Sequence, residues 1–151
     1  MRVQVKEATL PPGMEGAWRI DAHAAGLEAL PSAAELVTAV FNLRPTALSR
    51  EDVVRTAVGR FRVETLRDWR GLSQVVLRTK APGLQARFGI TARESSEGEY
   101  SVVLHNSVHP HSWVGHVYFR LIEPFHHLLM EWIVLPRLRK RARRARGHET
   151  R

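Results

Sequence analysis

The sequence predicts an α+β fold in which an antiparallel sheet packs against one long C-terminal helix. After residue 113, apolar side chains recur at gaps of three and four, which is the period of an α-helix. Residues 61–108 contain segments that alternate with a period of two between turn-forming residues, which favours antiparallel strands. Because strands and helices are grouped along the chain rather than alternating, the predicted class is α+β and not α/β.

The N-terminal quarter is expected to contain two strands and a helix. Arg2–Thr9 alternates weakly, as an edge strand or an arm does, before Pro11-Pro12-Gly13 interrupts it. Residues 18–25 are interpreted as a second strand. Ser32-Ala33-Ala34-Glu35 is a capping box, which predicts that a helix begins there. The buried side of that helix would consist of Leu36, Val37, Val40 and Phe41.

A second helix and an antiparallel meander are expected next. Pro45 ends the first helix, and Ser49 is expected to cap a second one that continues to about Phe61. Turn residues such as Arg70-Gly71 and Pro82-Gly83 then separate the strands. The expected strands are Phe61–Leu66, Gln74–Thr79, Leu84–Arg93 and Tyr100–Val108.

The last helix is expected to begin after Ser112, a residue type favoured at helix N-caps. Its apolar stripe consists of Val114, Val117, Tyr118, Leu121, Ile122, Phe125, Leu128, Leu129, Trp132 and Ile133. Pro124 lies within the stripe, which continues in phase on both sides, so this proline predicts a bend and not an end. We expect the stripe to face the sheet. A long helix across a curved antiparallel sheet is the helix-grip arrangement, which often encloses an apolar cavity.

One domain, residues 1–136, and a basic C-terminal tail, residues 137–151, are expected, with Pro136 as the break. A chain of 151 residues suits a single hydrophobic core. The tail has eight basic residues and one acidic residue, whereas the remainder has 15 basic and 14 acidic residues. The net charge of +8 therefore belongs almost entirely to the tail, and the near-neutral body argues against a general nucleic-acid-binding surface.

Composition excludes several kinds of site. The absence of cysteine rules out disulfides, thiolate metal sites and a cysteine nucleophile. The polar start lacks the apolar segment of a signal peptide, and no apolar run reaches the ~20 residues of a membrane span, so a cytoplasmic protein is expected. No phosphate-binding loop, dinucleotide fingerprint or Gly-x-Ser-x-Gly elbow is present, and we predict no cofactor.

The histidines are interpreted mainly as structural residues, and no metal site is predicted. His105 and His109 share a strand face but lie about 13 Å apart at ~3.3 Å per residue, too far for two ligands of one ion. His127 is expected on a solvated charged face, four residues from Glu123 and from Glu131. His126 lies at the edge of the apolar stripe, where it can offer a proton donor or acceptor to a cavity.

The arginine-rich tail allows three interpretations. Cations near a helix C-terminus stabilise the helix dipole and aid solubility, but seven basic residues in ten exceed what this requires. The alternatives are binding to an anionic membrane surface, or to a nucleic acid or acidic protein. The residues predicted to bind a polyanion are Arg137, Arg139, Lys140, Arg141, Arg143, Arg144 and Arg146.

The start of the last helix carries a distinctive pattern. After Val108 it contains His109 and His111, then Gly115 and Tyr118, and finally Pro124-Phe125-His126. This pattern resembles an uncharacterised bacterial family, domain of unknown function 2867, although the tail and the second helix depart from it. The resemblance implies a START-like (SRPBCC) helix-grip fold and a small apolar ligand. It supplies no catalytic residue, because none is established for the family.

Three functions are considered on this basis. The leading hypothesis is a non-enzymatic helix-grip domain that binds a small apolar ligand between the sheet and the long helix. The alternatives are a peripheral membrane or polyanion-binding adaptor that acts through the tail, and a START-like cyclase or hydrolase that uses His126 as acid or base. Homodimerisation through the long helix stays open. The predicted ligand-binding residues are Trp113, Tyr118, Ile122, Phe125, His126 and Leu129.

Overall fold

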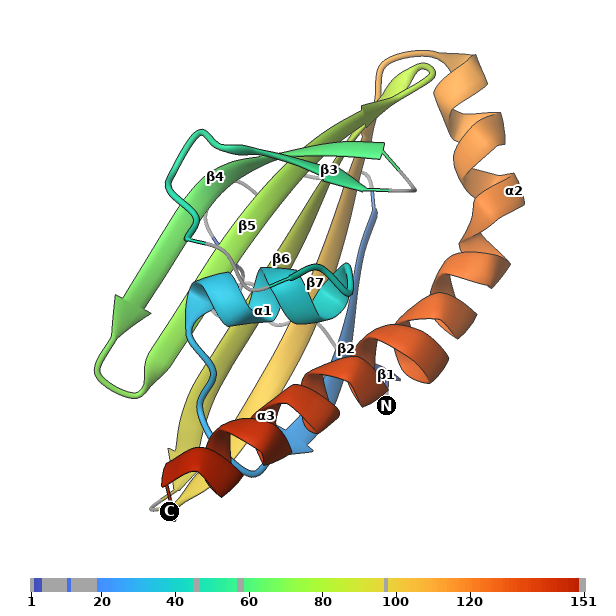
Figure 1. Cartoon of the computed structure of the whole chain (residues 1–151). Helices are drawn as coiled ribbons and strands as arrows, with labels where there is room; N and C mark the ends of the chain where they lie inside the picture. The colour runs from blue at the N-terminus through green and yellow to red at the C-terminus, as the bar shows by residue number, and fades with distance from the viewer. Residues whose placement is uncertain are drawn as a thin grey trace.

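The computed structural model describes residues 2–3, 11, 19–44, 47–56, 59–96 and 98–149, and it describes side chains at residue 11 and within 23–144. In this part of the chain, one antiparallel sheet of seven strands is covered on one face by helices (Figure 1). The strands are β1 (Arg2–Val3), β2 (Arg19–Leu27), β3 (Val53–Thr56), β4 (Gly59–Trp69), β5 (Leu72–Ala81), β6 (Leu84–Ser96) and β7 (Glu99–Pro110). The helices are α1 (Ala33–Val40), α2 (Trp113–Leu129) and α3 (Leu135–Glu149), with a π-helical turn η2 (Met130–Val134) between α2 and α3.

The strand order is β1-β2-β7-β6-β5-β4-β3, so β3 to β7 form a meander and β2 pairs with its last strand. The four strands expected between residues 61 and 108 are confirmed as β4 to β7. The strand expected at 18–25 is confirmed as β2 from Arg19 onward, whereas Trp18 lies outside the described residues. Of the strand expected at Arg2–Thr9, Arg2–Val3 is described and forms β1.

Helix α1 begins at the predicted capping box. The Ser32 hydroxyl oxygen accepts a hydrogen bond from the Glu35 backbone N–H at 3.2 Å, and the Glu35 carboxylate accepts one from the Ser32 N–H at 2.9 Å. The helix ends at Val40, with Phe41 as its C-cap. Pro45, where the end was expected, lies outside the described residues.

The second helix expected from Ser49 to Phe61 is wrong, because the described residues of this segment include β3 and the start of β4, which pair with each other. Val53 pairs with Arg62, and Thr56 pairs with Gly59. Glu51 has a φ of 71°, which no helix interior accepts. The β-branched residues Val53, Val54 and Thr56 favour a strand once a partner strand is available.

The core lies between the sheet and the layer made by α1, η2 and α3. Each strand from β2 to β7 contributes buried side chains to it, and these meet buried side chains from the three helical segments. The helical members are Leu36, Val37, Val40, Met130, Val134, Leu135, Leu138 and Ala142. A smaller cluster of Leu84, Val108 and Phe119 lies under the first half of α2.

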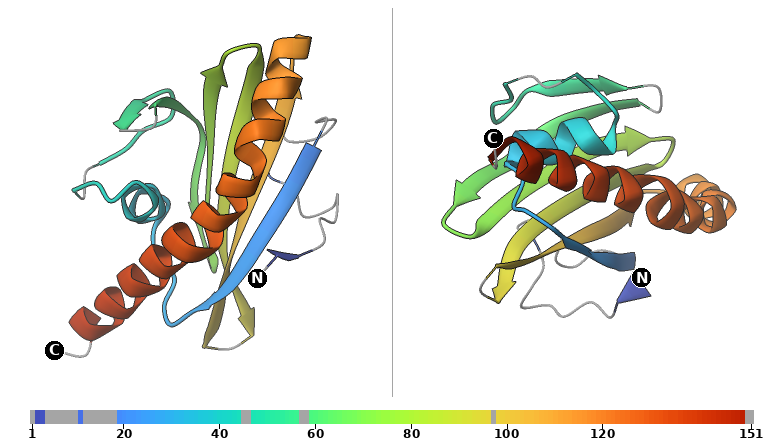
Figure 2. Two further views of the ribbon diagram at one scale, coloured as in Figure 1. Left: turned by 90° about the vertical axis from the view of Figure 1, so that its right-hand side faces the viewer. Right: turned by 60° about the horizontal axis from the view of Figure 1, so that its bottom comes forward.

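The long C-terminal helix is continuous through α2, η2 and α3, and Figures 1 and 2 show that it bends as it crosses the sheet. Pro124 lies inside α2 without ending it, as expected. The expected boundary at residue 136 falls within the helix. Leu138 and Ala142 are fully buried in the core, so at least this part of the expected tail belongs to the domain.

Candidate functional site

A polar region lies between the two hydrophobic clusters on the helix-covered face of the sheet. Leu104 belongs to the large core cluster, and Val108 belongs to the small cluster with Phe119. Asn106 stands between them on the same face of β7, because side chains alternate along a strand. On the neighbouring strand, His23 pairs with Leu104 and shares this face.

His23 is the centre of this polar region and is only 1% exposed. Its Nε2 lies 3.4 Å from Nδ1 of His127 on α2, and its Nδ1 lies 3.4 Å from Oε1 of Glu131 in η2. His127 places its own Nε2 at 3.7 Å from Oε1 of Glu123. Two imidazole rings therefore lie in contact between two carboxylates.

The helix supplies three of these four groups through its period. Glu123, His127 and Glu131 follow at intervals of four residues, which places them on one side of the helix. The sequence predicted the Glu123–His127 pair, and it is present. The prediction that this side faces solvent is wrong, because the side meets His23 on β2.

The two imidazole rings can share a hydrogen bond. A neutral imidazole has one donor nitrogen and one acceptor nitrogen, so the contact between His23 and His127 requires one ring to donate and the other to accept. The outer nitrogen of each ring faces a carboxylate, from Glu131 on one side and Glu123 on the other.

Asn106 adds an unsatisfied hydrogen-bond donor to the region. Its Nδ2 is buried, and none of the described residues accepts a hydrogen bond from it. A buried donor without a partner costs roughly 1–3 kcal/mol of stability, which an acceptor atom brought in by a ligand recovers. The side chain therefore marks a point where a bound molecule gains a hydrogen bond.

The opposite face of β7 buries His105 and Ser107. Burial lowers the pKa of the His105 imidazole from its ordinary value of 6.5 to about 4, so the ring is neutral near pH 7. Among the described residues, no three His, Asp or Glu side chains are grouped so that they could hold a metal ion.

The predicted ligand-binding residues do not line the space under α2 as a set. Ile122 and His126 are half-buried, and Ile122 packs against the small cluster. Trp113, Tyr118, Phe125 and Leu129 are exposed. The prediction that the apolar stripe faces the sheet is therefore wrong for most of its length, because α1 and α3 already cover the large core.

The start of α2 is anchored on the turn between β5 and β6. The His111 backbone N–H donates to the Gly83 carbonyl at 2.7 Å. A side chain on Gly115 would collide with that same carbonyl, so the close approach of α2 to the turn requires glycine. Gly83 has a φ of 71°, which also favours glycine.

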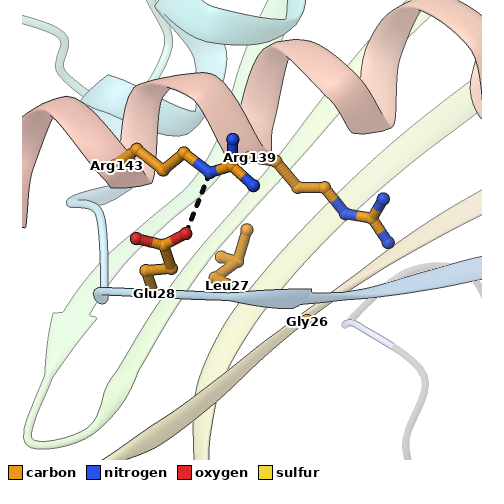
Figure 3. Close-up of a pocket in the computed structure, with 5 residues that line it drawn as sticks. All are labelled: Gly26, Leu27, Glu28, Arg139 and Arg143. Carbon is orange, nitrogen blue, oxygen red and sulfur yellow. Dashed lines mark hydrogen bonds and ion pairs between the residues drawn. The ribbon is translucent and has the colours of Figure 1, made fainter.

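The basic residues predicted to bind a polyanion fall into two groups. The Arg137 guanidinium donates to the Val40 carbonyl at 3.0 Å, Arg141 lies 3.6 Å from Glu35, and Arg143 lies 2.9 Å from Glu28. Figure 3 shows the last pair in a surface hollow of about 190 Å³ between α3 and the end of β2. The second group consists of Arg139, Lys140 and Arg144, which are exposed and make no hydrogen bond or ion pair of this kind with the described residues. The Arg146 side chain lies outside the described part.

A family model described as "Protein of unknown function (DUF2867)" matches residues 16–132. The chain belongs to this DUF2867 family. The resemblance recognised in the sequence is thereby confirmed. A search of curated proteins finds no match.

Solved structures are similar to this chain. The crystal structure of the hypothetical protein jhp0584 from Helicobacter pylori aligns with a TM-score of 0.63 at 10% identity, over 93% of this chain and 98% of that one. A point mutant of norcoclaurine synthase from Thalictrum flavum, in complex with a transition-state analogue, aligns with a TM-score of 0.47 at 11% identity, over 87% and 96%. The alignment with jhp0584 supports an α+β helix-grip fold for the DUF2867 chain.

Proposed function

We propose that this DUF2867 protein is a non-enzymatic START-like domain that binds a small, mostly apolar ligand between its sheet and α2. The observation that carries the proposal is the buried Asn106 amide, whose donor has no partner among the described residues. It stands between Leu104 and Val108 on β7, beside the paired imidazoles of His23 and His127. The ligand would be held by polar contacts at its centre and apolar contacts around them.

The composition of this face supports a mixed ligand. Along β7, Asn106 lies between Leu104 and Val108, which belong to two different hydrophobic clusters. Phe88 on β6 pairs with Asn106, and Phe119 on α2 belongs to the same cluster as Val108. The Asn106 amide offers a donor, whereas the ring nitrogens of His23 and His127 already face each other and the two carboxylates. A carbonyl or hydroxyl group on an otherwise apolar molecule matches the Asn106 donor.

The weak attachment of α2 supports a route of entry. Within this helix only Gly115 and Phe119 are buried, whereas α3 buries Leu135, Leu138 and Ala142 in the large core. Displacing α2 therefore breaks few apolar contacts, and the anchor at Gly83 limits the movement at its first turn.

The test is native mass spectrometry of the gently purified full chain, followed by organic extraction of any bound molecule. We expect a reproducible adduct on the unaltered protein that Asn106→Leu loses, because leucine keeps the volume of the side chain but cannot donate a hydrogen bond. Ser107→Ala is the matched control: it also removes a buried polar group without a described partner, but from the opposite face of the same strand. It should retain the adduct.

Two results would overturn the proposal. One is a clean mass without adduct for the unaltered protein, even after incubation with extracted cell lipids and small molecules. The other is an adduct that Asn106→Leu retains as fully as Ser107→Ala does. Urea unfolding of both variants would verify that each is folded before the masses are compared.

A further inference from the structure

The outward side of α2 and η2 is almost entirely apolar. Thirteen residues between 113 and 133 are exposed, and all except Arg120 and Glu131 are apolar or aromatic. The exposed apolar residues are Trp113, Val114, Val117, Tyr118, Leu121, Pro124, Phe125, Leu128, Leu129, Trp132 and Ile133. We call this surface the outer stripe.

The outer stripe is larger than the apolar patches that soluble proteins ordinarily expose. Trp113, Phe125 and Trp132 are 76%, 73% and 76% exposed. At ~150–250 Å² for each aromatic side chain, these three alone expose roughly 340–560 Å². Contiguous apolar patches beyond a few hundred Å² mark interaction surfaces.

A basic surface continues the outer stripe along the same helix. All the exposed residues between 135 and 144 are Pro136 or basic: Arg137, Arg139, Lys140, Arg143 and Arg144. Five of the six residues, all but Arg137, line one open surface hollow. The buried sides of α2 and α3 both face the sheet, whose position relative to the helix Figure 2 shows, so the outer stripe and the basic surface lie on the exposed sides of the same helix, with Arg139 and Arg143 at the flank next to β2 (Figure 3).

We propose that this side of the long helix docks on an anionic membrane surface. The outer stripe would enter the boundary between headgroups and acyl chains, and the cations of α3 would contact lipid phosphates. The stripe spans 21 residues, about 30 Å at ~1.5 Å per residue. Because the opposite side of α2 packs on the sheet, the helix would lie in the plane of the membrane. No helix in the described part of the chain is long and apolar enough to cross one.

Charge and residue type favour a membrane over a second copy of the chain. A symmetric dimer would bring two copies of the same surface together. That surface is apolar and basic, and its acidic residue Glu131 is engaged with His23. Within residues 113–144, the exposed surface therefore offers a second copy one carboxylate, already in contact with His23, beside six exposed basic residues, whereas lipid phosphates supply many anions. Trp113 and Trp132 lie near the two ends of the stripe, and tryptophan is enriched at membrane interfaces.

The test is co-sedimentation of the full chain with lipid vesicles. One set consists of phosphatidylcholine alone, and the other contains phosphatidylserine as one third of the lipid. We expect binding to the second set, weaker binding at high salt, and little binding to the first. Vesicles with brominated acyl chains should quench the fluorescence of the tryptophans, and the double variant Trp113→Phe/Trp132→Phe should lose most of that quenching.

Matched variants separate the two parts of the surface. Leu121→Ser/Phe125→Ser should lower partitioning at least ~10-fold, because both side chains would be withdrawn from the apolar boundary. The control Trp69→Ser changes a side chain that is 77% exposed on β4 and should bind like the unaltered protein.

The charge variants follow the same design. Arg139→Gln/Lys140→Gln/Arg144→Gln should lower binding on the order of a hundredfold. Arg67→Gln/Arg70→Gln/Lys80→Gln removes the same charge from exposed positions on the sheet and should have a much smaller effect.

Three outcomes would overturn the proposal. The first is the absence of sedimentation with anionic vesicles. The second is equal binding by the stripe variant and the Trp69→Ser control. The third is a stable dimer in light scattering that Leu121→Ser/Phe125→Ser converts to a monomer, because this would assign the outer stripe to a second copy of the chain.

Discussion

The buried and exposed sides of the long helix can be distinguished by two leucine substitutions. Leu138 is fully buried in α3, within the segment that the sequence presented as a basic tail. Leu121 is 68% exposed in α2, within the stripe that the sequence presented as core. Leu138→Ala and Leu121→Ala remove the same atoms from helix interiors, so helix propensity changes equally in both.

The expected losses of stability differ several-fold. Removing three carbon groups from a fully buried leucine costs about 2.4 kcal/mol at ~0.8 kcal/mol per group, and the cavity left behind raises this to roughly 3–5 kcal/mol. Leu121 is about one-third buried, so its truncation should cost less than about 1 kcal/mol. For a domain of this size, the Leu138→Ala loss corresponds to a fall in Tm of roughly 6–20 °C.

Urea unfolding followed by circular dichroism measures both values, with Tm from thermal scans as a second readout. The reasoning holds if Leu138→Ala lowers the midpoint strongly while Leu121→Ala barely changes it and both keep the original m-value. If Leu121→Ala is the more damaging substitution, the helix has the orientation that the sequence suggested, and the outer stripe is core. Equal small losses would mean that α3 does not pack on the sheet.

Two further predictions concern single sites. The pKa of His105 is about 4 when folded and 6.5 when unfolded, so the unfolded chain binds one more proton between these values. The His105 contribution to the free energy of unfolding should therefore be complete above pH 6.5 and fall as the pH drops towards 4. His105→Gln should remove up to ~1.4 kcal/mol per pH unit from the slope of this free energy against pH, measured by urea unfolding. An unchanged slope would contradict the lowered pKa of His105. Gly115→Ala should destabilise by roughly 1–3 kcal/mol, because its methyl group meets the Gly83 carbonyl. Gly26→Ala, where nothing lies within 4 Å, is the control, and equal thermal shifts would contradict the close approach.

Local sequence signals predicted much of the fold. The Ser32–Glu35 capping box fixes the start of α1 through short-range hydrogen bonds, which need no tertiary partner. The strands of the meander have period-two patterns and glycine turns, so β4 to β7 lie where expected. The hairpin of β3 and β4 escaped prediction because Val53 and Val54 fit both a helical stripe and a strand, and the neighbouring strand decides between them.

The orientation of the long helix escaped prediction for a different reason. Periodicity identifies an apolar face but does not say which surface covers it. Leu138 and Ala142 are isolated among arginines, so they gave a weaker signal than the stripe, although they are the residues in the core. His23 was also missed, because a single histidine on an alanine-containing strand is visible as part of a site only when α2 brings His127 to it.

The pairing of β2 with β7 has a kinetic consequence. The hairpins between β4 and β7 join neighbouring segments, whereas Leu27 meets Tyr100, and Arg143 reaches back 115 positions to Glu28. Closing such long loops costs entropy before any contact compensates for it, so the meander should assemble first and receive β2 and α3 afterwards. Until that step, the buried face of β7 and β6 is open to solvent, and the interval before β2 and α3 arrive is when the chain is most exposed to aggregation.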